Sequence, residues 1–327
     1  MFNLFSLVVS HLLKNYEVVV IGGGAAGLSA ALYSARRGLT TILISPEIGG
    51  QAGTTFEIEN YPGRGFVTGP ELMMDFKLQA EASGTEFLLT EAVGLEKIDQ
   101  QFLVKTPTEN IPAVAVILAF GLTPRKLNLP EENNFLNKGL SYCATCDGPL
   151  FKNKIVAVIG GGPAGLEAAE YLGRLAAKVY LIARADKLTG EEVIKEKITA
   201  NSKIEIIYQT EIKQIIGEGQ VEQIVISKKV GEQIEEQVLK VNGVFVKVGY
   251  LANSTWLPDF IARDEKGQII TNKDTETNCP GVFAAGDITD IDYKQIVISA
   301  GEGAKAALRA YQYIQKTPRL GTDWGKK

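Results

Sequence analysis

The residues of this chain best suited to chemistry are two cysteines, Cys143 and Cys146, followed directly by Asp147. Cysteines three positions apart can close a small disulfide within one turn, and a pair at a helix start has depressed thiol pKa values. A zinc site needs four ligands, and besides this pair the chain offers only Cys279 and His11. The spacing therefore favours a redox-active disulfide over zinc, and two buried structural thiols are the remaining alternative.

An internal repeat predicts the elements around this pair. Residues 14–44 align without gaps on residues 152–182, and 17 of the 31 positions are identical. Each copy contains an apolar run, then G-x-G-x-x-G, then an Ala-rich stretch with helical spacing, then a second apolar run. This order predicts a βαβ unit twice, with buried parallel strands. The four expected strands are residues 17–21, 41–44, 155–159 and 179–182.

The three glycines of each copy have separate tasks in such a unit. The first lets the chain turn sharply out of the strand, the second lets the backbone approach a pyrophosphate, and the third lets helix and strand pack closely. The helix N-terminus then offers free N–H groups and a positive dipole end to the phosphates. Two such fingerprints predict two dinucleotides, a flavin and a nicotinamide nucleotide, against the alternative of plain strand–helix turns. In chain order the glycines are Gly22, Gly24 and Gly27, then Gly160, Gly162 and Gly165.

A third marker lies far downstream, in residues 282–287, which read VFAAGD. We expect a short apolar strand that ends in Gly286 and Asp287, before a helix over residues 296–313. An Asp at such a strand end can accept hydrogen bonds from a ribityl or ribose hydroxyl, while the following helix start faces the pyrophosphate. The marker supports FAD as the first dinucleotide, although A-G-D taken alone could be a turn.

These markers are out of order for simple tandem domains, because the second βαβ unit lies between the first one and the downstream strand. We therefore expect an α/β protein with two Rossmann-like dinucleotide-binding domains, the second inserted into the first. The FAD-binding domain comprises residues 1–124 and 251–327, with 1–13 as an N-terminal extension. Residues 125–250 form the pyridine-nucleotide domain, which carries the cysteine pair. The expected hinges are the turn-rich segments 121–125 and 249–254.

The composition excludes several classes of protein. A length of 327 residues suits two domains, and 45% hydrophobic residues can fill their cores. Thirty-four basic against 38 acidic residues argue against nucleic acid as the main partner, because tracking phosphates needs surplus Lys and Arg. Three cysteines are too few for a disulfide-stapled secreted domain, and no stretch reaches the roughly 18 apolar residues that span a membrane. We therefore expect a cytoplasmic protein that binds neither nucleic acid nor membrane.

Several motifs together resemble the low-molecular-weight thioredoxin reductases. The resemblance covers nearly the whole chain, from about Lys14 to Tyr313. It implies an FAD flavoprotein, typically a homodimer, which passes electrons from a pyridine nucleotide through the flavin and the cysteine pair to thioredoxin. The motifs that carry it are Gly49–Gln51 (GGQ), Glu59–Gly63 (ENYPG), Cys143–Asp147 (CATCD) just before the second glycine fingerprint, and Gly281–Asp287 (GVFAAGD).

The resemblance also implies roles for single residues. Cys146 would face the flavin, and Cys143 would attack the thioredoxin disulfide. Asp147 would protonate the departing thiolate, and a helix cap is its alternative role. The cofactor-binding residues expected for FAD are Gly22, Gly24, Ala25, Ala26, Gly27, Ser45, Glu47, Gly50, Gln51, Asn60, Asp287, Tyr293, Lys294 and Gln295. Those expected for the nicotinamide nucleotide are Gly160, Gly162, Pro163, Ala164, Gly165 and Arg184.

The nucleotide fingerprint departs from the pattern of that family. Residues 160–169 read GGGPAGLEAA where the family has G-G-G-N-x-A-x-E-E-A. Of the three arginines that grip the 2′-phosphate of NADPH only Arg184 remains, since Thr189 stands where the last one would fall. No acidic residue sits at the strand end to hold an NADH ribose either, because Asp186 lies a little beyond. NADPH, NADH and another donor, such as a ferredoxin or reduced flavin, therefore all stay open.

Two other functions also stay open. A flavin disulfide reductase that acts on another dithiol partner, such as a glutaredoxin-like or peroxidase-associated protein, would keep all of this chemistry. A non-catalytic FAD redox sensor would keep the dinucleotide sites without needing the intact cysteine pair and Asp147. Cys279 is expected to be a packed small residue rather than a third redox thiol. Thioredoxin is the favoured partner.

Overall fold

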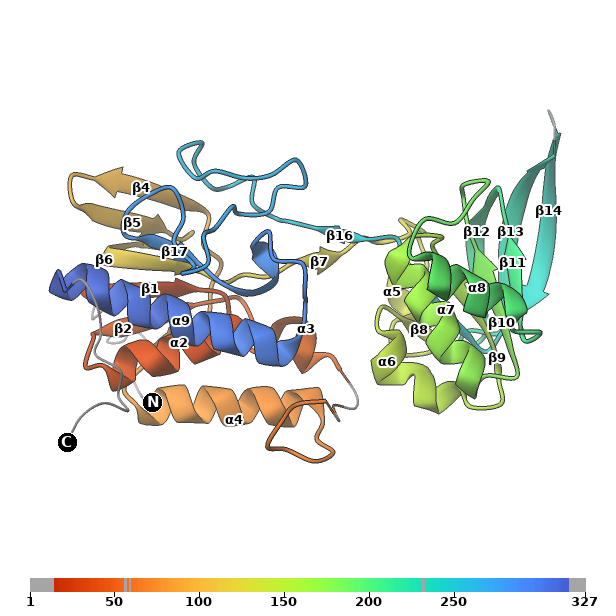
Figure 1. The fold of residues 1–327 in the computed structure, drawn as a ribbon, viewed down its shortest axis with the longest axis horizontal. Helices are drawn as coiled ribbons and strands as arrows, with labels where there is room; N and C mark the ends of the chain where they lie inside the picture. The colour runs from red at the N-terminus through yellow and green to blue at the C-terminus, as the bar shows by residue number, and fades with distance from the viewer. Residues whose placement is uncertain (1–14, 56–57, 59, 231–232, 318–327) are drawn as a thin grey trace. The chain divides into compact units, whose positions relative to one another are not determined.

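The computed structural model describes residues 15–317 except 56, 57, 59, 231 and 232. The expected N-terminal extension and His11 therefore lie outside the described residues. The chain divides into two compact units (Figure 1), with Met1–Thr123 and Leu251–Lys327 in unit 1 and Pro124–Tyr250 in unit 2. Both chain crossings fall within the segments expected as hinges, where β7 (Thr123–Pro124) and β16 (Tyr250–Leu251) form a two-stranded sheet.

Unit 1 is built on a seven-stranded sheet with the order β3-β2-β1-β6-β5-β4, and β17 also pairs with β6. The strands β1, β2, β3, β6 and β17 run parallel, whereas β4 and β5 are joined antiparallel to β6. The central strands are almost wholly apolar because both faces of the sheet are covered. The bounds are β1 (Tyr16–Ile21), β2 (Thr41–Ile44), β3 (Glu86–Leu88), β4 (Gly94–Ile98), β5 (Gln101–Lys105), β6 (Asn110–Leu118) and β17 (Val282–Ala284).

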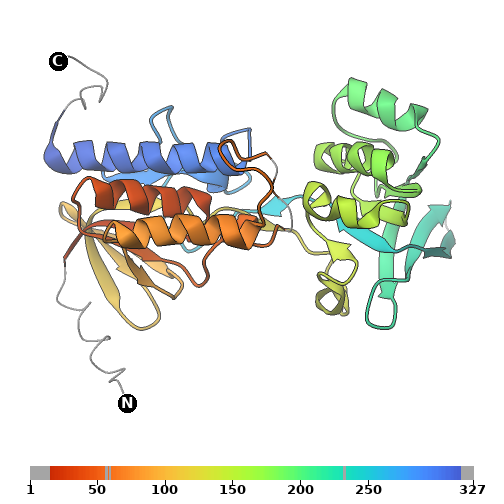
Figure 2. The same cartoon turned by 90° about the horizontal axis from the view of Figure 1, so that it is seen from below.

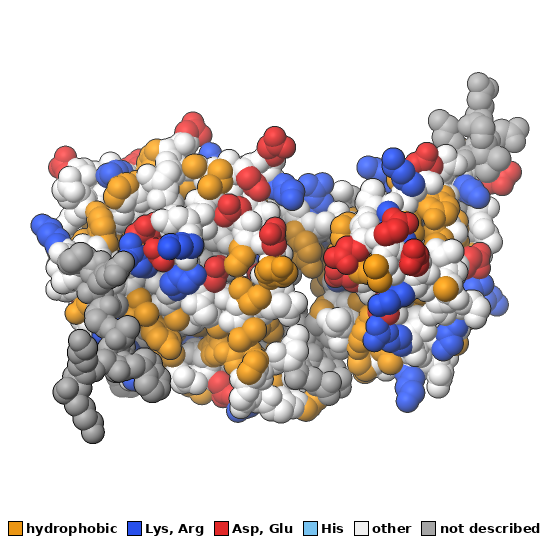
Figure 3. All heavy atoms as spheres, viewed as in Figure 1, with side chains coloured by type: hydrophobic (Ala, Val, Ile, Leu, Met, Phe, Trp, Pro, Cys, Tyr) orange, Lys and Arg blue, Asp and Glu red, His pale blue; other side chains and the backbone are white. Residues whose placement is uncertain are grey.

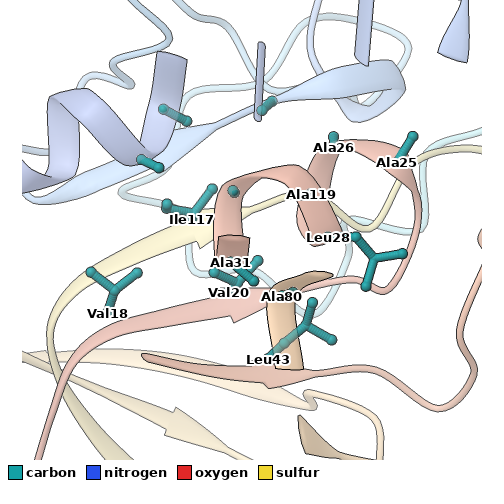
Figure 4. Close-up of a cluster of buried hydrophobic side chains, with 14 of the residues drawn as sticks. Val18, Val20, Ala25, Ala26, Leu28, Ala31, Leu43, Ala80, Ile117 and Ala119 are labelled. Carbon is teal, nitrogen blue, oxygen red and sulfur yellow. The ribbon is translucent and has the colours of Figure 1, made fainter. Parts of the chain in front are cut away.

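Three helices cover one face of this sheet, α2 (Ala25–Arg36), α4 (Gly69–Ala82) and α9 (Ile296–Gln315). They lie side by side in Figure 2, with α2 between the other two. Small residues on α2 let it pack closely on the strands, and Figure 4 shows its Ala31 beside Val20 of β1. The shorter elements of unit 1 are α3 (Gly50–Gly53) and the 3-10 turn η2 (Gly286–Ile288).

Unit 2 has a five-stranded parallel sheet with the order β11-β10-β9-β15-β8 and a separate antiparallel sheet with the order β12-β13-β14. The parallel strands are β8 (Leu140–Ser141), β9 (Ile155–Ile159), β10 (Lys178–Ile182), β11 (Ile204–Ile207) and β15 (Gly243–Val246). The antiparallel strands are β12 (Thr210–Ile216), β13 (Gln223–Val230) and β14 (Gln233–Lys240). The helices are α5 (Glu132–Phe135), α6 (Ala144–Asp147), η1 (Gly148–Phe151), α7 (Pro163–Leu175) and α8 (Glu192–Ala200).

Both βαβ units expected from the repeat are present, as β1–α2–β2 and β9–α7–β10, and the predicted fold class is confirmed. The prediction for residues 282–287 was wrong at its end, because β17 stops at Ala284. Gly286 has φ +76°, which turns the chain out of the strand and into η2. Among the described residues, no helix has the length and apolar character needed to cross a membrane.

Candidate functional site

The first glycine loop combines two crowded positions with one open position. Gly22 has φ +116°, and a Cβ there would lie 2.3 Å from the carbonyl oxygen of Ala119, at the end of β6. A Cβ at Gly27 would lie 1.8 Å from the carbonyl oxygen of Gly22, so only glycine lets α2 approach β1 this closely. A Cβ at Gly24 would have no described heavy atom within 4 Å. The open space at Gly24 fits the close approach of a pyrophosphate.

The second loop repeats this geometry in unit 2. Gly160 has φ +134°, and a Cβ there would lie 2.1 Å from the carbonyl oxygen of Lys247. A Cβ at Gly165 would lie 1.9 Å from the carbonyl oxygen of Gly160. At Gly162 the nearest described atom to an added Cβ is Oγ1 of Thr189, at 3.9 Å. The middle glycine is therefore the open one in both copies, as a dinucleotide site requires.

Each loop leads into a helix N-terminus whose N-cap residue is a glycine without a side chain. The backbone N–H groups of the first turn are therefore left for a ligand, and the positive end of the helix dipole favours an anion there. In α2 the first turn starts with Ala25 and Ala26, and in α7 with Pro163 and Ala164. Because proline has no N–H, and because the Gly165 N–H already donates to the carbonyl oxygen of Gly162, at 2.9 Å, the second site offers fewer donors than the first.

The segment after β2 closes one side of the first loop. The hydroxyl of Ser45 donates a hydrogen bond to the carbonyl oxygen of Glu47, at 2.6 Å. Gly50 has φ +52°, and a Cβ there would lie 3.3 Å from Cα of Gly24. The exposed Glu47 carboxylate follows β2, as does the acidic residue that binds a ribose hydroxyl in dinucleotide folds. These predicted residues therefore surround one loop.

The downstream marker packs on the first turn of α2, although it is remote in sequence. A Cβ at Gly286 would lie 2.7 Å from Cβ of Ala26. The Asp287 carboxylate accepts a hydrogen bond from the Ser299 hydroxyl, at 3.2 Å, and Lys294 Nζ donates to the Asp287 carbonyl oxygen, at 3.1 Å. Burial raises the pKa of Asp287, an effect that Lys294 and Ser299 oppose. A carboxyl group held in this way can bind a hydroxyl of a ligand.

Two further predicted flavin residues meet across 235 positions of sequence. Nδ2 of Asn60 donates a hydrogen bond to Oε1 of Gln295, at 3.2 Å. Nε2 of Gln51 donates to the carbonyl oxygen of Leu122, at 2.7 Å, which ties α3 to the segment after β6. The side chain of Tyr293 is 73% exposed and is not drawn into this cluster. The structure therefore joins Asn60 with Gln295 and anchors Gln51 on the segment after β6, whereas Tyr293 is left exposed.

The cysteine pair lies in unit 2 just after β8, with Cys143 directly before α6 and Cys146 within it. Cys143 is disulfide-bonded, and the side chain of Cys146 lies outside the described residues. The hydroxyl of Ser141 accepts a hydrogen bond from the N–H of Cys143, at 3.0 Å, and donates one to Oδ2 of Asp147, at 2.5 Å. Cys279 is a buried free thiol, which confirms that it is a packed small residue. Ser141 thus hydrogen-bonds both the backbone of the disulfide-bonded Cys143 and the carboxyl group of Asp147. We call the segment 141–147 the redox turn.

The partner of the Asp147 side chain is the Ser141 hydroxyl rather than a helix end. Asp147 precedes η1 as the N-cap residue, but its side chain makes no capping bond to the described backbone. Burial raises the pKa of its carboxyl group, while the hydrogen bond from Ser141 and the charge of Lys247 lower it. A half-buried carboxyl group that keeps its proton to higher pH than usual is better suited to donate a proton than an exposed one.

Arg184 stands two residues after β10 with its side chain exposed. Lys187 is also exposed, so a second cation is available on the same segment. The segment returns to the glycine loop, because Thr189 N donates a hydrogen bond to the carbonyl oxygen of Gly161, at 2.9 Å. Arg184 is therefore positioned on the segment next to the second dinucleotide loop, free to meet a ligand phosphate.

Sequence reasoning missed Ser141 and Lys247, which both bear on Asp147. Ser141 is an ordinary residue by its position, and it gave no signal. Lys247 had a signal, since a lysine directly follows the fully buried strand β15 and precedes Val248 and Gly249. A charge at the end of a buried parallel strand lies at the edge where such sheets bind ligands.

Comparison with known proteins adds the family. Residues 16–310 match the family described as pyridine nucleotide-disulphide oxidoreductase. The F subunit of alkyl hydroperoxide reductase from Staphylococcus aureus (strain MRSA252) is 39% identical over 303 residues, which are 91% of this chain and 59% of that protein. The counterpart in Staphylococcus epidermidis is 38% identical over 301 residues. This chain therefore spans about three fifths of the length of these curated relatives.

Solved structures agree with this family. Thioredoxin reductase from Streptococcus pyogenes MGAS5005 is 34% identical with a TM-score of 0.80, and the match covers 94% of this chain and 100% of that one. Thioredoxin reductase from Lactococcus lactis is 36% identical with a TM-score of 0.72, over 92% of this chain and 100% of that one. The resemblance deduced from the sequence motifs is confirmed.

Proposed function

Because this chain belongs to the pyridine nucleotide-disulphide oxidoreductase family, whose membership implies FAD and a nicotinamide nucleotide, we propose that it is a thioredoxin-disulfide reductase. Electrons would pass from NAD(P)H through FAD to the Cys143–Cys146 disulfide, and from there to thioredoxin or a thioredoxin-like protein. The observation that carries the proposal is the redox turn, where Ser141 hydrogen-bonds both the backbone of the disulfide-bonded Cys143 and the half-buried Asp147 carboxyl group.

The residues of unit 1 fit FAD. The open position at Gly24 and the free first turn of α2 suit its pyrophosphate, and the exposed Glu47 suits a ribose hydroxyl. Asp287 suits a ribityl hydroxyl, and the Asn60–Gln295 pair suits the polar edge of the ring. When bound, FAD supplies a carrier that accepts two electrons from a nicotinamide and gives them to a disulfide.

The residues of unit 2 fit a nicotinamide nucleotide. Its pyrophosphate would lie at Gly162 and at the first turn of α7, which Pro163 and Ala164 begin. We propose that Arg184 meets the 2′-phosphate of NADPH, with Lys187 as a second cation. The loss of one N–H donor at Pro163 and of two family arginines weakens this grip. NADH, or a donor such as ferredoxin, is the alternative.

The proposed dithiol chemistry balances without further groups. Two electrons and two protons convert the Cys143–Cys146 disulfide into two thiols. Cys143 passes its proton to the Asp147 carboxylate, and the resulting thiolate attacks the target disulfide and forms a mixed disulfide, while one target sulfur leaves as a thiolate. Asp147 gives this leaving thiolate its proton. Cys146 then loses its proton and attacks the Cys143 sulfur, which breaks the mixed disulfide and restores the starting one. That proton goes to the second target sulfur, so the target leaves with two thiols.

The proposed partner is a thioredoxin, because the match extends over the entire length of two of the solved thioredoxin reductase chains. The 39% identity to the F subunit of alkyl hydroperoxide reductase favours a second candidate, a dithiol protein of a hydroperoxide reductase system. The proposed site of action is the cytoplasm, a reducing compartment in which a catalytic dithiol and a free buried thiol both persist.

We propose a homodimer that uses the helical face of unit 1. Figure 3 shows hydrophobic side chains gathered over the helical layer of this unit. The exposed apolar residues there are Tyr33 on α2, Met74 and Leu78 on α4, and Val297 on α9. Neighbouring apolar side chains that stay exposed on a monomer mark a protein interface.

The test measures reduction of two partners with three donors. The FAD-loaded protein is mixed with thioredoxin, or with the dithiol protein of a hydroperoxide reductase system, and with NADPH, NADH or reduced ferredoxin. We expect turnover with thioredoxin and a nicotinamide nucleotide, and none in the Cys143→Ser control. Turnover with the second partner alone would replace thioredoxin by that partner. Turnover that survives in Cys143→Ser would refute the dithiol route.

A further inference from the structure

Lys247 connects the second dinucleotide loop with the redox turn. Its backbone N–H donates a hydrogen bond to the carbonyl oxygen of Ile159, at 2.8 Å. Its own carbonyl oxygen is the atom that leaves room only for glycine at position 160. The backbone of Lys247 is thus one wall of the glycine loop, while its side chain reaches in another direction.

The side chain of Lys247 ends on the redox turn. Its Nζ donates a hydrogen bond to the carbonyl oxygen of Tyr142, at 2.5 Å, and Tyr142 directly precedes Cys143. The phenol of Tyr142 is held separately, because its hydroxyl donates to the buried carboxylate of Glu132. The peptide unit before Cys143 is therefore fixed by an ammonium group from a strand 105 positions later in the chain.

The charges around Lys247 come from two helices. Burial lowers the pKa of Lys247, and this effect is opposed by Glu167 on α7 and Asp147 on α6. Burial raises the pKa of Asp147, and the hydrogen bond from Ser141 and the charge of Lys247 oppose that shift. The groups that face the Asp147 carboxyl are thus Ser141 from β8, Lys247 from the end of β15 and, once reduced, the thiols of its own turn. Partial burial of a charged lysine costs free energy, and the attraction of the two nearby carboxylates offsets part of that cost.

We propose that Lys247 is a positioning residue for the dithiol chemistry, since its ammonium group holds the Tyr142 carbonyl directly before Cys143 and places a cation at the redox turn. This inference rests on the proposed function. An acid that acts in every cycle must give up its proton and regain it, and a buried carboxyl group without a nearby cation holds its proton too firmly. Lys247 sets that balance from outside the Cys-x-x-Cys segment.

The experiment follows the carboxyl group directly. The full FAD-loaded chain is labelled with carboxyl-¹³C aspartate, and the signal of Asp147, assigned by its loss in Asp147→Asn, is titrated by NMR in the oxidised protein. We expect this signal to titrate at higher pH in Lys247→Met than in the wild type. Lys247→Arg keeps the charge, so it should titrate like the wild type. Ser141→Ala removes the other stabilising contact of the carboxylate and should also move the titration to higher pH.

Turnover with the protein partner completes the test. Lys247→Met should lose roughly tenfold in turnover, because it impairs but does not remove the general acid. Lys247→Arg should turn over like the wild type. The rate of flavin reduction by the nucleotide should change by less than about twofold in both Lys247 variants, because Lys247 contacts the glycine loop through its backbone, which neither substitution removes. Lys195→Met, which removes a partly exposed charge paired with Glu192 on α8, is the matched control and should leave all readouts unchanged.

Several outcomes would overturn the inference. An Asp147 signal that titrates alike in the wild type and in Lys247→Met would refute the coupling, and the Ser141→Ala titration would then show whether the method detects such a shift. Equal losses in Lys247→Arg and Lys247→Met would mean that Lys247 is only structural. If the wild type reduces no partner, the proposed function fails, and the titration still decides whether Lys247 acts on Asp147.

Discussion

The first glycine loop makes a prediction that separates folding from cofactor binding. Gly24 and Gly27 belong to one fingerprint, yet the space around them differs completely. In Gly27→Ala the new methyl group would start 1.8 Å from the Gly22 carbonyl oxygen, and it must move about 1.6 Å away to reach ordinary contact at 3.4 Å. In Gly24→Ala the methyl group enters open space, and the backbone there has φ −82° and ψ −173°, which alanine adopts freely.

The magnitudes follow from these distances. Overpacking between helix and strand costs about 1–3 kcal/mol, and the better helix propensity of alanine returns at most about 1 kcal/mol of this. We therefore expect Gly27→Ala to destabilise the FAD-free protein by about 1–2 kcal/mol. Gly24→Ala should change that stability by less than about 0.5 kcal/mol, as surface substitutions usually do. Its methyl group would instead meet the pyrophosphate, so FAD affinity should fall at least tenfold, which is about 1.4 kcal/mol.

The assay pairs thermal unfolding of the FAD-free protein with FAD titration followed by quenching of flavin fluorescence. Gly301→Ala is the matched control, because a Cβ there also meets open space, on the exposed side of α9. It should bind FAD as the wild type does. Wild-type affinity in Gly24→Ala would refute the placement of the pyrophosphate, and wild-type stability in Gly27→Ala would refute the packing argument.

The remaining predictions concern electron transfer and one helix. Cys143→Ser and Cys146→Ser should each abolish reduction of the protein partner but keep the bound flavin, as a turnover assay and an absorption spectrum would show. Turnover in Cys146→Ser would mean that electrons leave by another route. Arg184→Ala should slow flavin reduction by NADPH about tenfold or more and leave NADH unaffected in stopped flow, because NADH has no 2′-phosphate; equal losses would make Arg184 structural. Thr68→Ala should destabilise the protein by about 1 kcal/mol in denaturant unfolding, because Thr68 and Glu71 form a complete capping box at the start of α4; unchanged stability would contradict that role.

The local part of the fold could be predicted from the sequence because the repeat states it twice. Identical residues at both fingerprints marked the strands and the helix starts, and the structure has β1, β2, β9 and β10 within one residue of the expected bounds. The end of β17 was missed, because the residues up to Ala285 are as apolar as a strand and only the positive φ of Gly286 ends it. A pattern of side-chain types does not encode that angle.

The candidate site could be predicted only where its residues lie within one motif. The contact between Asn60 and Gln295 and the one between Lys247 and Tyr142 join segments that are far apart in the chain. Spacing carries no information about such pairs. Tyr142 and Lys247 follow β8 and β15, two neighbouring parallel strands whose order in the sheet is not written locally, and Asn60 meets the residue that precedes α9. The resemblance supplied Asn60 and Gln295, and it could not supply Lys247.

The pairing of β17 with β6 has a consequence for how the chain folds while it is being synthesised. Val116 lies opposite Val282, so the central sheet of unit 1 waits for a strand made 166 residues later. Unit 2 is continuous from Pro124 to Tyr250 and can fold as soon as it leaves the ribosome. The early part of unit 1 meanwhile exposes the side of β6 that β17 covers, together with the face of α2 on which α9 packs. A nascent chain paused before residue 282 would therefore carry a folded redox turn and an unfinished flavin site, and it would depend on chaperones until its last strand and helix arrive.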